Sequence, residues 1–439
     1  MTRRDVVPVG EALRFWCKLG FINFGGPTGQ IAIMHSELVD RKRWIDEDRF
    51  LHALSFCMLL PGPEAQQLAI YVGWLLNGTL GGIAAGVLFV VPAFFLLLAL
   101  SWSYAAHGDL AWVAAVCGGL SAAVVGIVAA ATLTIAARAL RTRALAVIAA
   151  VVFAATFVVG IPFPVVVLGA GGAGLVLSGW RASWFPAPVP ADGSTDVPSP
   201  VRRSAGRSLA VLAAGLAAWF VPLVVVGAAT GIGSVYAREG MFFSQVAVVT
   251  FGGAYAVLAY VGHEVVARFG LGTADVVAGL GLAETTPGPL ILVVEFLGFV
   301  AAYRNPGNLA PLVAGTLGAA VTTWATFAPS FLWIFLGAPY VESLRANARL
   351  RAGLGAITAT VVGVITGLAL TVAASALFSD VGGATPFFTA IPVPQLGSLE
   401  WGHAAIALAA FVALRRFRVH VAWVVAAAAV AGLALEAVR

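Results

Sequence analysis

The chain carries the same pair of Gly- and Pro-rich breaks twice, each inside a long apolar stretch. Phe-Gly-Gly-Pro at 24–27 and Leu-Pro-Gly-Pro at 60–63 return as Phe-Gly-Gly-Ala at 251–254 and Thr-Pro-Gly-Pro at 286–289. Such breaks leave backbone groups without helical partners, which a membrane protein tolerates only where protein or a water-filled cavity surrounds them. Interrupted helices at matching places in two halves of a chain are typical of secondary transporters, whose sites lie at the breaks.

The spacing of the repeat predicts one ancestral module that was duplicated. The shift from Gly25 to Gly252 is 252 − 25 = 227 residues, and the shift from Pro61 to Pro287 is 287 − 61 = 226. Two independent motifs that agree within one residue indicate a common origin of the two halves. We expect a first module at 11–180, a Pro-rich cytoplasmic linker at 181–207, an extra transmembrane helix at 208–230 and a second module at 238–439.

Composition identifies the broad class of the protein. Hydrophobic residues make up 60% of the chain, charged residues make up 10%, and the mean hydropathy is +0.96. A soluble domain has about 25% charged residues. We therefore expect an all-α polytopic membrane protein embedded in a lipid bilayer.

Apolar runs of about 20 residues, the length that crosses a bilayer, divide each module into about six helical elements. The first module is expected to hold broken elements at 13–35 and 50–76 and unbroken spans at 80–104, 110–137, 145–159 and 162–180. The second is expected to hold broken elements at 242–266 and 274–303 and spans at 309–336, 350–377, 401–414 and 419–438.

The extra helix between two equal modules predicts that the second is inverted relative to the first. Arginines follow the fourth element of the first module but precede the fourth element of the second, at 138–143 and 345–351 respectively. The positive-inside rule places both clusters in the cytoplasm, together with the N-terminus. The two broken elements of a module either both cross the bilayer or both fold back as re-entrant hairpins. Both arrangements leave the rest of the module in the same orientation, so the sequence does not choose between them.

The residues beside the breaks form a candidate site for an anion. Pro63 suits the first position of a helix, whose free N–H groups and positive dipole end attract negative charge. Alternatively, the Gly and Pro residues only permit kinks and close helix packing. The candidate set is Asn23, Gly25, Gly26, Pro27, Gln30, Pro61, Gly62, Pro63, Glu64, Gln66, Gln67, Thr250, Gly252, Gly253, Tyr255, Thr285, Thr286, Pro287, Gly288 and Pro289.

Four ionisable residues at membrane depth are candidates for charge compensation or proton coupling, because such residues are costly in a bilayer. They are Lys18, Glu64, Glu284 and Glu295. Glu64 and Glu284 flank the Pro-Gly-Pro turns from opposite sides, so either is able to carry a proton while the helix ends hold the anion. Glu64 has the alternative of a helix-capping carboxylate, and Lys18 has the alternative of snorkelling to the interface.

The sequence offers no signature of an enzyme or of a resident cofactor. The six histidines are scattered, the three cysteines form no Cys-x-x-Cys pair, and His263-Glu264 has no second histidine in the spacing of a zinc protease. A nucleotide-binding Gly-x-x-x-x-Gly-Lys motif is also absent. The net charge of +5 is small for 439 residues. We expect no enzyme activity, no metal, no cofactor and no nucleic-acid partner.

At this level of detail the chain resembles the chromate ion transporter family in its two-domain form. The first half matches in 24–27, Glu37-Leu38-Val39, Trp44-Ile45 and 60–74, and the second half matches in 250–255 and 286–289. The resemblance covers both modules. The second half departs in two places, with Ala254 for Pro27 and Leu290 for Glu64, so the two halves are not expected to bind identically.

The resemblance implies export of chromate from the bacterial cytoplasm across the inner membrane, with chromate resistance as the result and sulfate as a competing oxyanion. Moving a dianion out of a negative-inside cell gains about 2 × 2.3 kcal/mol per 100 mV, so the membrane potential is a sufficient driving force. Proton coupling and anion exchange stay open, as does a homodimer. The alternative is an importer or exchanger of sulfate or another oxyanion.

Overall fold

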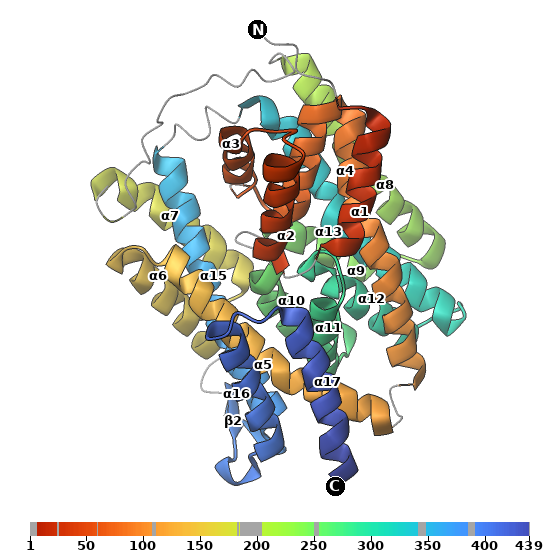
Figure 1. Ribbon diagram of the computed structural model, residues 1–439, viewed down its shortest axis with the longest axis vertical. Helices are drawn as coiled ribbons and strands as arrows, with labels where there is room; N and C mark the ends of the chain where they lie inside the picture. The colour runs from red at the N-terminus through yellow and green to blue at the C-terminus, as the bar shows by residue number, and fades with distance from the viewer. Residues whose placement is uncertain are drawn as a thin grey trace. The chain divides into compact units, whose positions relative to one another are not determined.

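The structure is a computed structural model that describes residues 7–23, 26–58, 60–107, 111–181, 184, 204–249, 254–340, 348–384 and 391–438. These residues are mostly helical (Figure 1). The chain forms two compact units: Met1–Ala99, Val189–Ala254 and Thr286–Ala346 make the first, and Leu100–Pro188, Tyr255–Thr285 and Asn347–Arg439 make the second. Each unit takes segments from both halves of the sequence. The units therefore do not coincide with the predicted modules. That the two modules arose by duplication remains a prediction.

The first unit holds the helices that flank both Pro-Gly-Pro turns. It contains α1 (Val9–Ile22), α2 (Gly26–His35), the π-helix η1 (Ser36–Arg41), α3 (Glu47–Cys57), most of α4 (Glu64–His107), α8 (Ala205–Thr230), α9 (Val235–Val249), the 3-10 turns η4 (Leu290–Leu292) and η5 (Ala338–Tyr340), α12 (Val293–Arg304) and α13 (Pro311–Gly337).

The second unit is built from helices that lack these turns. It contains the end of α4, α5 (Ala111–Ala139), α6 (Arg143–Phe153), the π-helix η2 (Ala154–Val159), α7 (Phe163–Trp180), α10 (Ala254–Phe269), α11 (Thr273–Thr285), α15 (Ala348–Leu377), β1 (Val381–Ala384), β2 (Ile391–Pro394), the 3-10 turn η6 (Leu396–Ser398), α16 (Trp401–Arg415) and α17 (Val421–Val438).

Six of the helices in the described part of the chain are long and apolar enough to cross a membrane. They are α4, the segment Gly118–Ala137 of α5, α7, α8, α13 and the segment Ala352–Leu377 of α15. The prediction of a polytopic helical protein is thereby confirmed. The boundary predicted between 76 and 80 lies inside α4, where Asn77 and Gly78 have non-helical backbone angles and divide the helix in two.

The structure departs from the expected secondary structure in two places. A short antiparallel ribbon of β1 and β2 interrupts the all-α fold, with Val381 opposite Pro394 and Ala384 opposite Ile391. Prolines at 392 and 394 prevent a helix but are tolerated in a two-stranded ribbon, which is all edge. The first broken element of the second module, expected at about 242–266, begins somewhat earlier, because α9 starts at Val235.

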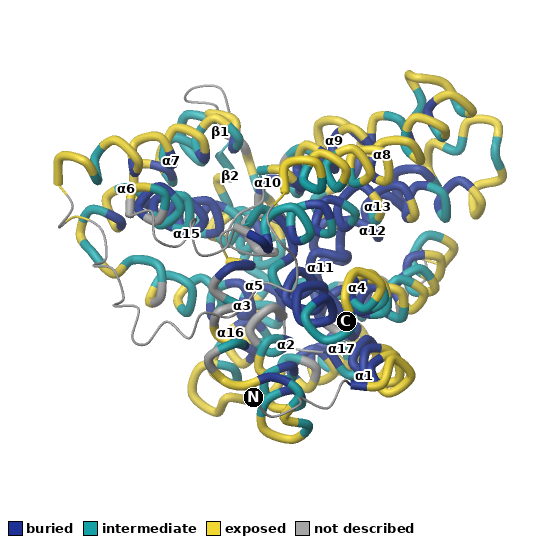
Figure 2. The backbone as a smooth tube through the Cα atoms, turned by 90° about the horizontal axis from the view of Figure 1, so that it is seen from above, coloured by how far each residue is buried: buried dark blue, intermediate teal, exposed yellow. Residues whose placement is uncertain are grey.

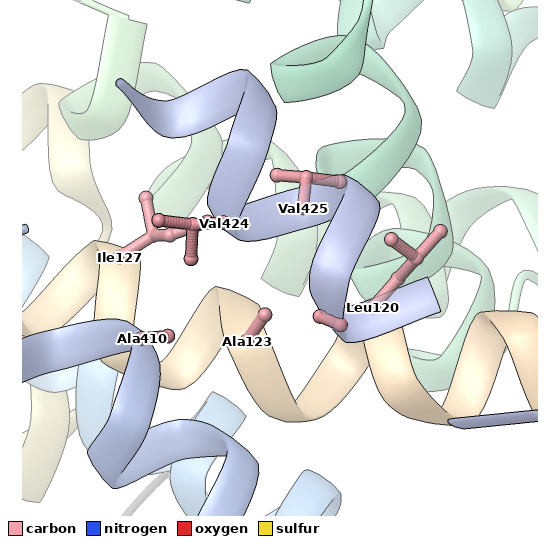
Figure 3. Packing of buried hydrophobic residues seen from close by; sticks show 7 residues of the cluster. Leu120, Ala123, Ile127, Ala410, Val424 and Val425 are labelled. Carbon is pink, nitrogen blue, oxygen red and sulfur yellow. The ribbon is translucent and has the colours of Figure 1, made fainter. Parts of the chain in front are cut away.

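Small residues allow the helices of the second unit to approach closely. Leu120, Ala123 and Ile127 of α5 pack against α16 and α17 in a cluster of buried hydrophobic residues (Figure 3). A Cβ on Gly119 would collide with the backbone of α17, and one on Gly126 would collide with that of α16. This is the small-residue packing of membrane helices, where close backbone contact substitutes for a hydrophobic driving force.

Two helices of the first unit show opposite patterns of burial (Figure 2). Every residue of α12 from Val293 to Ala302 is buried. In α8 only Trp219 and Gly227 are buried, although the helix is strongly apolar along its length. An exposed apolar helix of 26 residues suits contact with lipid, whereas α12 belongs to the interior of its unit.

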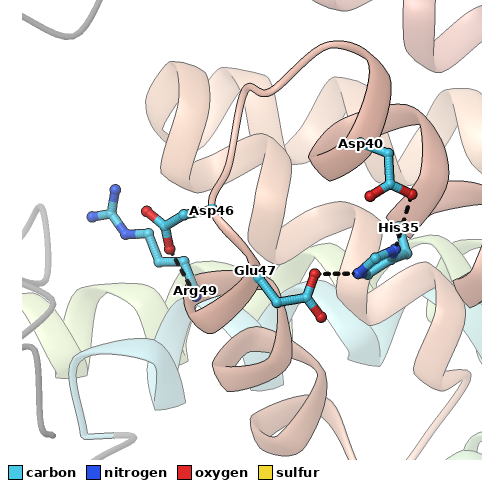
Figure 4. A network of polar contacts seen from close by, with 5 residues as sticks. All are labelled: His35, Asp40, Asp46, Glu47 and Arg49. Atoms are coloured by element: carbon cyan, nitrogen blue, oxygen red, sulfur yellow. Dashed lines mark hydrogen bonds and ion pairs between the residues drawn. The ribbon is translucent and has the colours of Figure 1, made fainter.

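A polar network at one end of α2 fixes the connection to α3 (Figure 4). His35 at the end of α2 contacts Glu47 through Nε2 at 2.5 Å and Asp40 through Nδ1 at 3.5 Å. Asp46 caps α3 by accepting a hydrogen bond from the backbone N–H of Arg49 at 2.9 Å. The network holds in place the hairpin that carries Gln30 on one arm and leads to the first Pro-Gly-Pro turn on the other.

Candidate anion-binding site at the two Pro-Gly-Pro turns

Both Pro-Gly-Pro turns lie in the first unit, and their central glycines share the same φ angle. Gly62 and Gly288 each have φ = +117°, a value that L side chains rarely adopt. The first turn leads directly into α4 at Glu64, and the second leads into η4 and then α12. Glycine is therefore required at the centre of each turn for conformational reasons.

The second turn is held by the break in the first half of the sequence. The backbone N–H of Gly288 donates to the carbonyl oxygen of Asn23 at 2.8 Å, and its own carbonyl oxygen accepts from Nε2 of Gln30 at 2.5 Å. Asn23 follows α1 and Gln30 lies in α2, so the two bonds come from residues on either side of the first Gly-Gly-Pro motif. Breaks from the two halves of the chain are thus brought into direct contact.

The first turn is closed by Gln67 and approached by α13. Nε2 of Gln67 donates to the carbonyl oxygen of Pro61 at 2.6 Å, and its backbone N–H donates to that of Pro63 at 2.9 Å. Oγ of Ser330, on α13, lies 3.2 Å from the position that a Cβ on Gly62 would take. The turn therefore has polar side chains from α4 and α13 against it.

Several buried polar atoms near the turns have no hydrogen-bond partner among the described residues. They are Nδ2 and Oδ1 of Asn23, Oε1 of Gln30, Gln66 and Gln67, and Oγ of Ser330. All five side chains are at most 1% exposed. Buried polar groups are nearly always paired, so this concentration indicates places for water or a polar ligand. Asn23 and Gln30 belong to the second turn, whereas Gln67 and Ser330 belong to the first.

The unpartnered atoms offer both donors and acceptors. Nδ2 of Asn23 and Oγ of Ser330 are donors. Nε2 of Gln30 and of Gln67 each donates one hydrogen bond and has a second N–H. The first N–H groups of α4 are donors as well. The side-chain carbonyl oxygens are acceptors. An oxyanion would take the donors, and water or a hydroxyl group on the ligand would satisfy the acceptors.

Part of the predicted site lies outside the described residues. Gly25, Thr250, Gly252 and Gly253 are in this group. Gly26 and Pro27 begin α2, Tyr255 lies in α10 and Thr285 ends α11. Thr286 is buried in the first unit, next to Pro287.

The four predicted ionisable residues occupy different environments. Glu64 is the first residue of α4 and is partly buried. Lys18 is exposed on α1 and so does not belong to the buried polar groups at the turns. Glu284 is buried in α11, in the second unit. Glu295 is fully buried in α12, and neither of its carboxylate oxygens has a hydrogen-bond partner among the described residues.

Sequence reasoning missed Ser330 and Glu239. Ser330 stands in an apolar helix next to Pro329, and a polar residue beside a helix-bending proline is a signal that could have identified it. Glu239 is a charged residue within α9 and is fully buried. The described residues contain no group of His, Cys, Asp and Glu side chains that would hold a metal ion.

Comparison with known proteins places this arrangement in context. A model of the chromate transporter family matches residues 10–175 and 239–433. The chain is 32% identical to the chromate transport protein of Pseudomonas aeruginosa, over 79% of this chain and 77% of that protein. It is 30% identical to the chromate transport protein of Cupriavidus metallidurans over 83% and 82%, and 29% identical to a probable chromate transport protein of Synechococcus elongatus over 81% and 82%. No solved structure matches the chain.

Proposed function

Because the chain belongs to the chromate transporter family, we propose that it is a secondary transporter that exports chromate from the bacterial cytoplasm. The observation that carries the proposal is the set of buried, unpartnered polar atoms at the two Pro-Gly-Pro turns. These atoms lie in a multi-pass membrane protein, where unpaired polar groups are costly. A group of them is therefore a candidate binding site. Membership of a transporter family also agrees with the lack of an enzyme signature in the sequence.

Chromate binds, in this proposal, between the start of α4 and the amides that surround the turns. The first N–H groups of α4 and its positive dipole end face the anion. Asn23, Gln67 and Ser330 donate further hydrogen bonds, and waters that enter with the anion satisfy the carbonyl acceptors. Sulfate has the same charge and shape and competes for the same groups.

The membrane potential supplies the driving force. A chromate dianion that leaves a cell with a negative interior gains about 2 × 2.3 kcal/mol per 100 mV. The proposed location is the bacterial inner membrane, with a cytoplasmic N-terminus and two inverted modules. The basic residues between helices support this orientation by the positive-inside rule.

Chromate uptake into everted membrane vesicles tests both the substrate and the direction. Vesicles that contain the protein are expected to accumulate chromate faster than empty vesicles, and collapse of the membrane potential is expected to slow uptake. Asn23→Leu is expected to reduce the rate at least about tenfold, the equivalent of losing about 1.4 kcal/mol of polar interaction. The side chain of Asn23 makes no hydrogen bond among the described residues, so its loss removes site chemistry rather than structural bonds.

Gln245→Leu is the matched control, because Gln245 is an exposed amide on α9 in the same unit. Its uptake should equal that of the wild type. If the folded wild-type protein gives no uptake above empty vesicles, chromate export is refuted. Chromate entry only into right-side-out vesicles would instead identify an importer.

A further inference from the structure

Glu239 is an acid in the interior of the first unit that the proposed anion site does not use. Its side chain is 0% exposed, and neither carboxylate oxygen has a hydrogen-bond partner among the described residues. Oε2 lies 3.2 Å from the position that a Cβ on Gly318 of α13 would occupy. The carboxyl group therefore packs against a bare stretch of α13 backbone.

Glu295 lies on α12, the helix whose Gly298 packs against the same part of α13. It is also 0% exposed with both oxygens unpartnered. Gly298, one turn later on α12, packs so tightly that its Cβ would lie 2.6 Å from Oγ1 of Thr322 and 3.0 Å from the carbonyl oxygen of Gly318. Residues three apart share a helix face. We call Glu239, Glu295, Gly298, Gly318 and Thr322 the acidic seam.

Among the described residues, no basic side chain is buried within the acidic seam. α13 has no titratable side chain. Thr322 already donates its hydroxyl hydrogen to backbone oxygens of α13. On α9 itself, Arg238 is adjacent to Glu239 but exposed, and the hydroxyl of Tyr236 donates to the carbonyl oxygen of Pro306 at 3.3 Å. Apart from Glu295, the other helices packed against Glu239 contribute titratable groups only near their ends. These are Tyr303 and Arg304 at the end of α12 and Arg207 at the start of α8.

Two buried carboxylates without hydrogen bonds cannot both remain ionised at acceptable cost, since an isolated buried charge is strongly disfavoured and normally becomes neutral. We propose that Glu239 is the proton-binding group of the transport cycle, with Glu295 as the second acid of the same seam. This inference rests on the proposed transport function and adds its coupling ion. It assigns the proton to Glu239, whereas the sequence alone suggested Glu64 or Glu284 as the proton carrier.

The acidic seam and the proposed anion site are separate but share one helix. Gly318 and Ser330 are twelve residues apart on α13, about 18 Å at 1.5 Å per residue. Pro329 lies between them, next to Ser330, and removes a helical hydrogen bond at that point. Protonation that changes the packing of α9 and α12 on Gly318 would therefore act on the helix that reaches the first turn.

Reconstituted vesicles with the membrane potential clamped at zero test the proposal. With one proton coupled to each anion, a pH difference of one unit is expected to change the steady accumulation ratio of chromate about tenfold in the wild type. Glu239→Gln mimics the protonated carboxyl group and is expected to leave that ratio near one. The variant should still exchange chromate in counterflow at equal pH, which shows that it is folded and binds substrate.

Glu11→Gln is the matched control, because Glu11 is 51% exposed and pairs with Lys42 at 3.1 Å in the same unit. It should behave as the wild type. Any effect of pH on chromate itself persists in Glu239→Gln, so the difference between the two proteins isolates the carboxyl group. A pH response in Glu239→Gln equal to that of the wild type overturns the proposal, as does a wild type whose accumulation responds to a sodium gradient instead.

The two proposals fail in distinguishable ways. Wild-type counterflow without any response to pH would leave chromate transport standing and refute proton binding at Glu239, whereas the absence of counterflow would refute chromate transport itself. Labelling gives a readout that needs no variant. Dicyclohexylcarbodiimide, which reacts with protonated carboxyl groups in apolar surroundings, is expected to modify Glu239 but not Glu11, as detected by peptide mass spectrometry. Unmodified Glu239 in the labelled wild type would also refute the proposal.

Discussion

The central glycines of the two Pro-Gly-Pro turns have the same φ angle, but the turns have different surroundings. Gly62 and Gly288 share φ = +117°, yet the first turn is followed by Glu64, Ala65 and two glutamines, and the second by three buried apolar residues, Leu290–Leu292. The first turn starts a long helix at once, whereas the second passes through a 3-10 turn. Repetition of a backbone shape therefore does not imply repetition of a binding site.

The turns also differ in what holds them. Gln67 reaches Pro61 within its own segment, six residues away. Gln30 reaches Gly288 from 258 residues away. The first bond is local, whereas the second ties distant parts of the chain together. We infer that Gln67, at the first turn, contributes more to anion binding and that Gln30, at the second turn, contributes more to the stability of the unit.

Alanine at the centre of each turn should give the largest effect. Gly288→Ala adds a Cβ that collides with that of Ala93, so strain of about 1–2 kcal/mol from positive φ adds to overpacking of about 1–3 kcal/mol. Gly62→Ala meets the movable end of Gln67 at 2.9 Å and should lose less. The melting temperature and the yield of monodisperse protein in detergent measure both variants.

Gly78→Ala calibrates the strain term alone. Gly78 has φ = +66°, and nothing lies within 4 Å of its Cβ position. The expected order of destabilisation is therefore Gly288→Ala, then Gly62→Ala, then Gly78→Ala. If Gly288→Ala melts at the same temperature as Gly78→Ala, the expected collision of the new Cβ with Ala93 is contradicted.

Methionine in place of the two glutamines should separate binding from stability. Each substitution leaves a turn carbonyl without its donor, at a cost of about 1–3 kcal/mol. Gln67→Met should lower chromate uptake about tenfold, a change of about 1.4 kcal/mol, by removing an amide from the start of α4. Gln30→Met should lower the melting temperature more and the uptake of the remaining folded protein less.

Uptake per folded molecule and thermal unfolding, measured on the same preparations, check this prediction. The exposed amide variant Gln245→Leu is again the control. Equal ratios of uptake loss to stability loss in the two methionine variants would contradict the prediction that Gln67 acts mainly in anion binding and Gln30 mainly in stability.

Glu64→Gln should have the smallest effect. Glu64 opens α4, where a carboxylate interacts favourably with the helix dipole by about 0.3–1 kcal/mol. We therefore expect a small drop in melting temperature and chromate uptake within about threefold of the wild type, less than 1 kcal/mol. A loss of two orders of magnitude in uptake, with folding intact, would instead assign Glu64 a direct role in transport and weaken the case for Glu239.

Local sequence determined the helical membrane class, the breaks and the amides beside them. Apolar length predicts spans such as 208–230, realised as α8, because a bilayer demands about 20 apolar residues whatever the fold. Gly and Pro at 61–63 and 287–289 predict turns, because positive φ and missing N–H groups are properties of single residues. Candidate residues such as Gln30 and Gln67 were therefore identifiable from their neighbours in the chain.

Only the tertiary structure decided which of these residues meet. The bond from Gln30 to Gly288, the approach of Ser330 to Gly62 and the burial of Glu239 against Gly318 all join segments far apart in the sequence. Residue type and spacing contain no information on such pairings, because they arise when helices pack and exclude water from whatever side chains lie between them. For the same reason Glu239, which the sequence analysis did not single out, is a fully buried acid in the folded protein.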